Sequence, residues 1–263
     1  MRWNHYLFGP MFRQSFNPGR KGLPMKLNGQ KIIVLGGTSG IGLATAQAAA
    51  EEGAKVLVVS SRQDSVDQAL GALPANSSGE VVDLSRENAI AEFFRKAGAF
   101  DHLVYTAGES LKLGELGDLS IDEARQFWNV RYWGAFAAIK FGSPNIRPGG
   151  SVVLTTGIAG TRPRKGWSVA ASICSAMEGL TRALAVELAP IRVNAVSPGV
   201  VRSPLWNGMS EADRAAMYRD VGAALPVRRV GEVADIAATH LYLMRENFST
   251  GQTIVVDGGA VLV

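Results

Sequence analysis

The sequence contains few of the residues that stabilise small secreted or metal-dependent domains. It has one cysteine, Cys174, among 263 residues, which excludes a disulfide framework. No Cys or His pairs occur at metal-ligand spacing, so we predict no metal site. No uncharged apolar run approaches the ~18 residues that a membrane-spanning helix needs. We therefore expect a protein of a reducing compartment, most simply the cytoplasm, with no membrane partner.

Acidic residues are absent from the first 24 residues. Four of the 27 basic residues lie there (Arg2, Arg13, Arg20, Lys21), which leaves 23 basic residues against the 23 acidic ones. The remainder is therefore neutral, and no basic face predicts a nucleic-acid partner. Because residues 1–24 lack helical or strand periodicity, we predict a basic flexible N-terminal extension. The alternatives are an arm that binds a partner and a chain that starts at Met25.

Short apolar runs alternate with helical patterns from residue 31 onward. We expect strands over 31–35, 55–59, 79–82, 101–105, 151–155, 191–196 and 254–256. We expect helices over 41–52, 64–70, 87–97, 121–141 and 169–189. This alternation is typical of an α/β fold, a doubly wound parallel sheet of seven strands with helices on both faces. No linker or repeat follows residue 25, so we predict a single domain over 25–263.

A glycine-rich loop joins the first expected strand to the first expected helix. Its sequence is Gly36-Gly37-Thr38-Ser39-Gly40-Ile41-Gly42, with the spacing Gly-x-x-x-Gly-x-Gly. Glycines here let the backbone approach a pyrophosphate, and the helix directs its N–H groups at it. Alone, such a loop also fits a simple tight turn. Between a buried strand and an Ala-rich helix, it predicts a Rossmann-type dinucleotide-binding domain.

The end of the second expected strand indicates which dinucleotide is bound. Domains that prefer NAD(H) place an acidic residue here to hold the ribose 2′-OH. This chain has Ser60, Ser61 and Arg62 instead. A guanidinium donates bidentate, charge-assisted hydrogen bonds to a phosphate. We therefore predict NADP(H), with Ser61 and Arg62 at its 2′-phosphate. The alternatives are NAD(H) and an Arg62 that is an ordinary surface residue.

Further motifs resemble the short-chain dehydrogenase/reductase family over about residues 28–259. They are the glycine loop, Val82-Asp83-Leu84, Thr106-Ala107-Gly108, the segment 191–199, and the segments 250–252 and 256–259. The resemblance implies a small-molecule substrate, a homodimer or homotetramer, and a substrate lid at about 204–225. It implies cofactor contacts from Gly36, Thr38, Ser39, Gly40, Ile41, Gly42, Asp83, Leu84, Ala107, Gly108, Pro198, Gly199 and Ser203.

The residues that carry this family's carbonyl chemistry are absent from the matching positions. The family uses a tyrosine as general acid and base, a lysine four residues later, a serine and an asparagine. Spacing places Arg131 at the asparagine position, Gly157 at the serine, Ala170 at the tyrosine and Cys174 at the lysine. Because a general acid contributes ~10²–10⁴-fold, we predict that ordinary ketone reduction is lost. We expect Cys174 to be a small apolar filler.

Two residues are weak candidates to replace the missing acid. Tyr105, at the end of the fourth expected strand, is a candidate proton donor, or else it packs beneath the cofactor. Arg131 is a candidate for polarising a carbonyl or binding a carboxylate, or else it forms a salt bridge. Arg162, Arg164 and Lys165 are candidates for reaching an acidic substrate, or else they belong to a solvated loop.

These observations leave three hypotheses for function. The first is an atypical NADP(H)-dependent oxidoreductase whose substrate needs little proton help, such as an iminium or a polarised enone. The second is a catalytically inactive NADP(H) sensor, or the partner subunit of an active relative. The third is a non-redox lyase or isomerase that uses the same pocket. The fold and the expected cofactor loop agree best with the first hypothesis.

Overall fold

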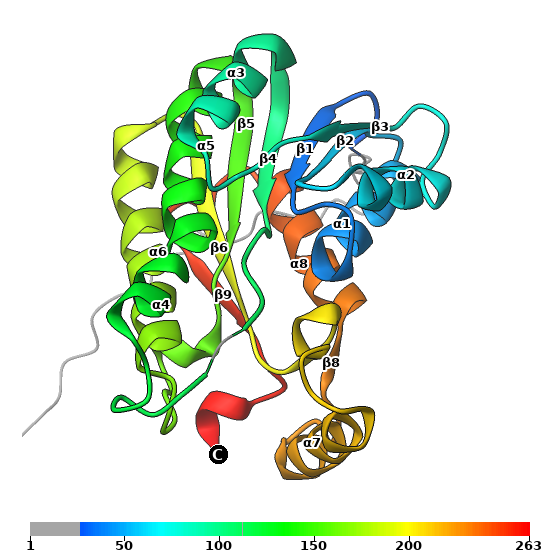
Figure 1. The fold of residues 1–263 in the computed structure, drawn as a ribbon. Helices are drawn as coiled ribbons and strands as arrows, with labels where there is room; N and C mark the ends of the chain where they lie inside the picture. The colour runs from blue at the N-terminus through cyan, green and yellow to red at the C-terminus, as the bar shows by residue number, and fades with distance from the viewer. Residues whose placement is uncertain (1–26, 112) are drawn as a thin grey trace, which may run out of the picture.

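Seven parallel strands form the centre of the protein. The computed structural model describes residues 27–111 and 113–263, so the extension expected over residues 1–24 lies outside the described residues. The strand order of the main sheet is β3-β2-β1-β4-β5-β6-β9 (Figure 1). The strands are β1 (Lys31–Leu35), β2 (Lys55–Ser60), β3 (Ser78–Val81), β4 (Phe100–Tyr105), β5 (Ile146–Thr155), β6 (Arg192–Pro198) and β9 (Thr253–Val256). This order confirms the predicted doubly wound α/β fold.

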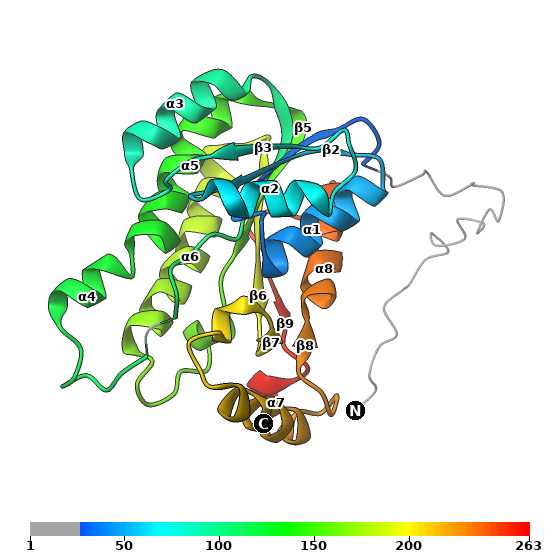
Figure 2. The ribbon, with the colours of Figure 1, turned by 45° about the vertical axis from the view of Figure 1, so that its right-hand side comes forward.

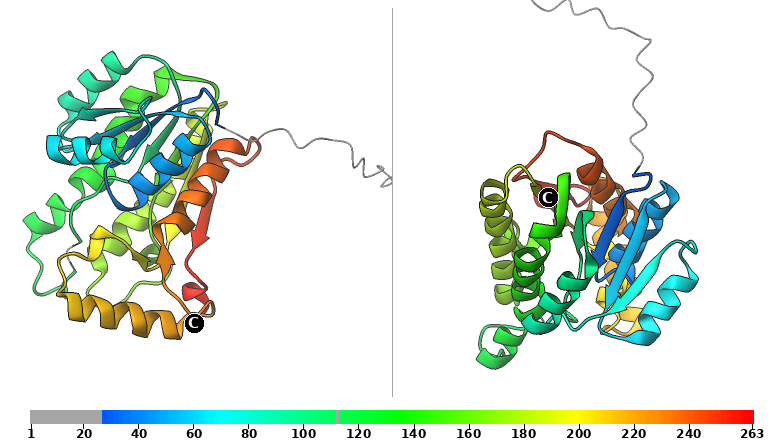
Figure 3. Two further views of the ribbon diagram at one scale, coloured as in Figure 1. Left: turned by 90° about the vertical axis from the view of Figure 1, so that its right-hand side faces the viewer. Right: turned by 90° about the horizontal axis from the view of Figure 1, so that it is seen from above.

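Helices cover both faces of the sheet, and each face has its own apolar core (Figure 3). Side chains alternate between the faces along a strand. In β1, Ile33 and Leu35 enter one core, whereas Ile32 and Val34 enter the other. The first core is covered by α3 (Glu87–Ala97), α5 (Ala135–Gly142) and α6 (Ser168–Glu187). The second is covered by α1 (Gly40–Glu51), α2 (Gln63–Gly71) and α8 (Val233–Arg245).

Helix α6 is, among the described helices, the one that is long and apolar enough to cross a membrane. Its buried side chains, which include Met177 and Leu184, belong to the first core. The helix also packs against β6. Its apolar character is therefore explained by its place on the sheet.

The single helix expected over residues 121–141 was wrong, because that segment is interrupted. Helix α4 (Ile121–Gln126) is followed by a π-helical stretch (Asn129–Gly134) before α5 begins. Both backbone groups of Val130 bond outside the segment: its N–H donates to Glu109 Oε1 (2.6 Å), and its carbonyl accepts from the Tyr105 hydroxyl (2.5 Å). These long-range hydrogen bonds compete with the regular helical ladder.

The segment expected as a lid contains its own helix. Helix α7 (Glu211–Ala224) lies at the end of the molecule to which the β6 and β9 arrows point (Figure 2). Two short strands, β7 (Val201–Arg202) and β8 (Gly231–Glu232), pair in parallel beside it. The sequence prediction assigned no element between residues 226 and 253 and so missed both β8 and α8. A capping box, formed by Glu232 and Asp235, marks where α8 begins.

Candidate functional site

A cavity of about 1060 Å³ opens at the carboxyl ends of the strands. This is where open α/β sheets bind their ligands. Every residue that we assigned to the cofactor lines this one cavity. They are Gly36, Thr38, Ser39, Gly40, Ile41, Gly42, Ser61, Arg62, Asp83, Leu84, Ala107, Gly108, Pro198, Gly199 and Ser203. Segments far apart in sequence thus converge on one binding surface.

The loop between β1 and α1 requires glycine for steric reasons. A Cβ on Gly36 would lie 2.6 Å from the Ala107 backbone nitrogen, and Gly36 has a φ of +82°. A Cβ on Gly42 would lie 2.1 Å from the Gly36 carbonyl oxygen. Helix α1 begins with no side-chain cap from Ser39 and no acidic residue in its first turn. Its first N–H groups are therefore left for an anion at the cavity wall.

The end of β2 presents a cation to the cavity. Arg62 is exposed, and its guanidinium donates to Ser65 Oγ through Nε (3.2 Å) and Nη2 (2.8 Å). Asp83 is the one acidic residue among the predicted cofactor residues, and it follows β3. Its carboxylate accepts hydrogen bonds from the Ser85 hydroxyl (2.6 Å) and the Ser85 backbone N–H (2.9 Å). These hydrogen bonds lower the pKa of Asp83. The polar groups at this end of the cavity fit a phosphorylated ribose.

The four positions expected to hold catalytic residues also line the cavity. They are occupied by Arg131, Gly157, Ala170 and Cys174. A Cβ on Gly157 would lie 3.4 Å from Cys174 Sγ, so these two positions face each other. Burial raises the pKa of the Cys174 thiol, which therefore remains protonated at neutral pH. Among the described residues, no tyrosine, lysine or histidine lines this cavity.

Arg131 is held against the cavity wall by Glu109. Its Nη2 donates to the Glu109 carbonyl oxygen, and its Nε lies 3.7 Å from Glu109 Oε2. The guanidinium also lies over the Phe127 ring, 4.7 Å from the centroid. Burial lowers the pKa of Arg131, but a guanidinium stays charged in proteins. Its Nη1 makes no hydrogen bond to a described residue and lies beside the Gly108 backbone.

Tyr105 does not line the cavity among the described residues. Its side chain is 1% exposed, and its hydroxyl donates to the Val130 carbonyl oxygen. Burial raises its pKa further above the ordinary value of a phenol. The geometry therefore favours the packing role that we weighed for Tyr105 and gives no support to proton donation.

The mouth of the cavity is formed by the loop 161–167, the lid and the C-terminal turn. Arg162 Nη1 donates to the Val261 carbonyl oxygen (3.2 Å), which joins the loop to the turn. Arg164 lies over the Trp167 ring, 5.7 Å from the centroid, and both line the cavity. Lys165 instead pairs with Glu115 (2.6 Å) and is not a lining residue.

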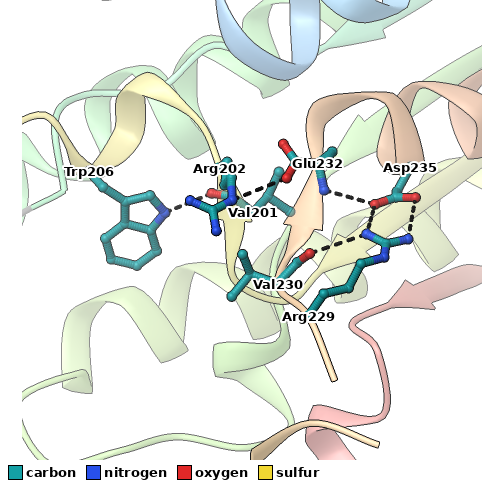
Figure 4. A network of polar contacts seen from close by, with 7 residues as sticks. All are labelled: Val201, Arg202, Trp206, Arg229, Val230, Glu232 and Asp235. Atoms are coloured by element: carbon teal, nitrogen blue, oxygen red, sulfur yellow. Dashed lines mark hydrogen bonds and ion pairs between the residues drawn. The ribbon is translucent and has the colours of Figure 1, made fainter. Parts of the chain in front are cut away.

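The lid is anchored by a polar network at its base (Figure 4). Trp206, a lining residue, donates from Nε1 to a β7 carbonyl oxygen (2.9 Å). Arg202 pairs with Glu232 across β7 and β8 (3.1 Å). Arg229 binds the Asp235 carboxylate through both terminal nitrogens (2.6 and 2.9 Å). The apolar lid residues are thus attached to α8, which is part of the fold's second core.

Sequence reasoning missed several residues of this wall. Glu109 follows directly after the Ala107-Gly108 motif, and that adjacency was the available signal. Thr155 lines the cavity and contacts the buried His240 (Oγ1 to Nε2, 3.3 Å), whose Nδ1 contacts Thr45 of α1 (2.9 Å). Trp167, Ala260 and Val263 also line the cavity, and no local sequence pattern predicts that they do.

The described residues contain no group of three or more His, Cys, Asp or Glu side chains that could hold a metal ion.

A family model described as enoyl-(acyl carrier protein) reductase matches residues 36–261. The chain belongs to the short-chain dehydrogenase/reductase family.

Three similar proteins illustrate this family membership. ATR9 of Stachybotrys chlorohalonatus, named a short-chain dehydrogenase/reductase, is 37% identical over 255 residues, which cover 90% of this chain and 98% of ATR9. The crystal structure of a small-chain dehydrogenase in complex with NADPH has 35% identity, a TM-score of 0.77 and coverage of 90% and 100%. The reductase/Diels-Alderase MalC from Malbranchea aurantiaca has 27% identity, a TM-score of 0.84 and coverage of 92% and 100%.

Family membership gives a context for the predicted catalytic positions. The fold and the glycine loop agree with this family, and the four positions that spacing predicts to be catalytic, Arg131, Gly157, Ala170 and Cys174, line the cavity. No tyrosine, lysine or histidine is among the described residues that line it.

Proposed function

We propose that the chain is an NADP(H)-dependent oxidoreductase that transfers hydride to a substrate which is already electrophilic. The observation that carries this proposal is the cavity itself. It is lined by all of the expected cofactor residues, and no tyrosine, lysine or histidine is among the described residues that line it. The similar structure of a small-chain dehydrogenase in complex with NADPH supports the choice of dinucleotide.

The residues present fit such a cofactor. The glycine loop and the first N–H groups of α1 would hold the pyrophosphate, because only a bare backbone fits beside Gly36 and Gly42. Arg62 would pair with the 2′-phosphate, for which an exposed guanidinium is suited. Pro198 and Gly199, at the end of β6, would lie beside the nicotinamide. When bound, NADPH supplies a hydride.

The side chains at the predicted catalytic positions limit which class of substrate can accept the hydride. Hydride addition to a ketone gives an alkoxide that must be protonated, and the described lining residues include no tyrosine, lysine or histidine to deliver the proton. Addition to a conjugated enone gives a delocalised enolate, and solvent water then protonates its carbon. Arg131 Nη1 is free to donate a hydrogen bond to the enolate oxygen. The same positive charge disfavours an iminium cation, so the enone is the preferred acceptor.

The test is turnover of bound NADPH with a matched set of enone, iminium and ketone. We expect the enone to be reduced and the ketone to be inert. Arg131→Met should lower enone turnover about 10²-fold or more, the usual cost of one oxyanion donor. Arg131→Lys should recover part of that loss, because an ammonium keeps the charge but loses the fork geometry. NADPH affinity and thermal unfolding are measured for each variant to separate chemistry from folding.

A non-catalytic NADP(H) sensor is the second candidate, and the four substituted positions favour it. It predicts that NADPH binds and is never consumed by any acceptor, and that its binding changes affinity for a protein partner. A lyase or isomerase in the same pocket would instead convert substrate with no change in NADPH absorbance. If neither NADPH nor NADH binds, the cofactor assignment itself is wrong.

A further inference from the structure

The cavity has an unequal number of basic and acidic side chains. The lining arginines are Arg62, Arg131, Arg162 and Arg164, and the lining acids are Asp83 and Glu109. Arg131 and Glu109 are partly buried and lie against each other, whereas Arg62, Arg162, Arg164 and Asp83 are exposed. The excess positive charge is therefore open to solvent, where it can attract a ligand with negative charge.

Three of these arginines are accounted for by their contacts. Arg62 donates to Ser65 beside the glycine loop. Arg131 is paired with Glu109. Arg162 donates to the carbonyl oxygen of Val261. Each has a polar partner that explains its position.

Arg164 differs from the other three. It makes no hydrogen bond or ion pair to a described residue, and its one described interaction is the contact with the Trp167 ring. Stacking on an indole leaves the edge of a guanidinium free, with its N–H donors available. Both side chains line the cavity, and Trp167 directly precedes α6, the helix that carries Ala170 and Cys174. Arg164 is exposed and is not among the residues expected to hold the dinucleotide, so its charge is left for another ligand group.

The cavity also has apolar lining residues. Trp167 contacts Arg164, and Leu205, Trp206 and Val221 of the lid line the same cavity. Together these side chains would cover the body of a ligand whose charged group meets Arg164.

We infer that Arg164, in the loop 161–167, binds the carboxylate of an apolar acid, so that the substrate is an enone that carries a separate carboxylate. The assignment of a carboxylate rests on the Arg164 guanidinium alone, whereas the enone rests on the function proposed above. In the reaction, hydride from NADPH forms a C–H bond at the carbon β to the ketone, the C=C π pair becomes the enolate double bond between the α carbon and the carbonyl carbon, and the C=O π pair moves to the oxygen. The enolate then takes a proton from water at its α carbon as its C=O bond re-forms, leaving NADP⁺, hydroxide and the saturated keto acid.

The test measures binding separately from chemistry. The probes are two acids, 3-benzoylpropionate and dodecanoate, each compared with its own primary amide, by calorimetry with and without saturating NADPH. We expect at least one acid to bind tenfold or more tightly than its amide, with an affinity that falls as salt rises. Arg164→Gln should lower that acid's affinity about tenfold and abolish the preference over the amide.

Lys165→Gln is the matched control. Lys165 is the next residue of the same loop, carries the same charge and pairs with Glu115 outside the cavity. We expect this variant to bind acid, amide and NADPH as the original chain does. Equal binding of each acid and its amide, or equal losses in the two variants, would overturn the inference.

The outcomes distinguish this inference from the proposed function. If acids bind through Arg164 but NADPH does not bind, the inference stands and the proposed function fails. If trans-3-benzoylacrylate is reduced by bound NADPH as fast as its amide in both the original chain and Arg164→Gln, the proposed function stands and the inference fails.

Discussion

The two ends of one cavity differ in how they depend on side chains. At the expected cofactor end, the wall is built from backbone and from glycines whose replacement would collide with neighbouring backbone. At the expected substrate end, the predicted catalytic positions hold Arg131, Gly157, Ala170 and Cys174. A fold can keep the first end through its backbone path while the second end changes residue by residue. On the function proposed here, cofactor binding and acid–base chemistry are therefore separable properties of one sheet edge.

The largest effect is expected from placing the family's usual serine, tyrosine and lysine at the predicted catalytic positions. The triple variant Gly157→Ser, Ala170→Tyr and Cys174→Lys should gain ketone reduction by ~10²–10⁴-fold over the original chain, the usual contribution of acid–base catalysis. Position 157 accepts a side chain, because a Cβ on Gly157 meets the Cys174 sulfur at 3.4 Å and the Pro198 carbonyl oxygen at 3.9 Å, both ordinary contacts, and that sulfur is itself replaced. NADPH oxidation with a set of ketones is the measurement. No gain from a folded, NADPH-binding variant would mean that the backbone at this end has also changed.

The cofactor end can be tested by a single methyl group. Gly42→Ala places a Cβ 2.1 Å from the Gly36 carbonyl oxygen, so we expect NADPH affinity to fall about 10²-fold or more. Gly179→Ala is the control, because its Cβ meets nothing within 4 Å in helix α6. The control should retain NADPH binding and gain roughly 0.5–1 kcal/mol of stability. Titration with NADPH and thermal unfolding of both variants give the comparison, which equal affinities would contradict.

Acidification should lower the stability of the fold through two buried histidines, His240 and His102. His240 bridges Thr155 at the cavity wall and Thr45 of α1, and burial lowers its pKa to about 3. His102, between Ser151 and Gln30, has its pKa lowered to about 4, chiefly by burial. Their unfolded forms take up protons near pH 6.5, whereas the folded forms do not.

Stability should therefore be highest above pH 6.5 and should fall as the pH drops from 6.5 towards 4. The expected slope is about 1.4 kcal/mol per pH unit for each histidine. Urea unfolding between pH 7.5 and 5 measures it, in the range before most carboxylates titrate. His102→Asn should roughly halve the slope. A free energy of unfolding that stays flat over this range would show that neither histidine is held neutral.

The smallest expected effect is on the preference for NADPH over NADH. Arg62→Ser removes the guanidinium at the end of β2 and should weaken NADPH binding about tenfold while leaving NADH binding nearly unchanged. Arg86→Ser, in a neighbouring exposed turn, is the control, because Arg86 does not line the cavity among the described residues. Equal losses for both nucleotides would indicate that Arg62 supports the loop and does not discriminate at the 2′ position.

Local pattern was enough to predict the sheet and to select residues that the structure brings together around one cavity. Buried strands such as Ile32–Leu35 are continuous apolar runs, and the glycine loop has a sequence that few other structures require. The helix expected over 121–141 failed because hydrogen bonds to Tyr105 and Glu109, distant in sequence, bind the backbone of Val130. Such contacts leave no local periodicity.

The substrate end was harder to predict for a related reason. Tyr105 was considered as a proton donor because strand position alone does not tell which way a terminal side chain turns. Arg164 and Lys165 are adjacent basic residues of one loop, yet only Arg164 lines the cavity. The difference depends on how the loop packs against Trp167 and Glu115, which the sequence of the loop does not specify.

One measurement tests the central claim, that hydride transfer persists here without an amino-acid proton donor. The original chain is saturated with NADPH deuterated at C4 of the nicotinamide and mixed in ordinary water with trans-3-benzoylacrylate, a matched iminium or acetophenone. We predict deuterium from one face of the cofactor at the carbon β to the ketone, solvent hydrogen at the α carbon, and no labelled alcohol from acetophenone. NADPH that binds but passes deuterium to none of the three acceptors, or passes it to acetophenone as readily as to the enone, would contradict the claim.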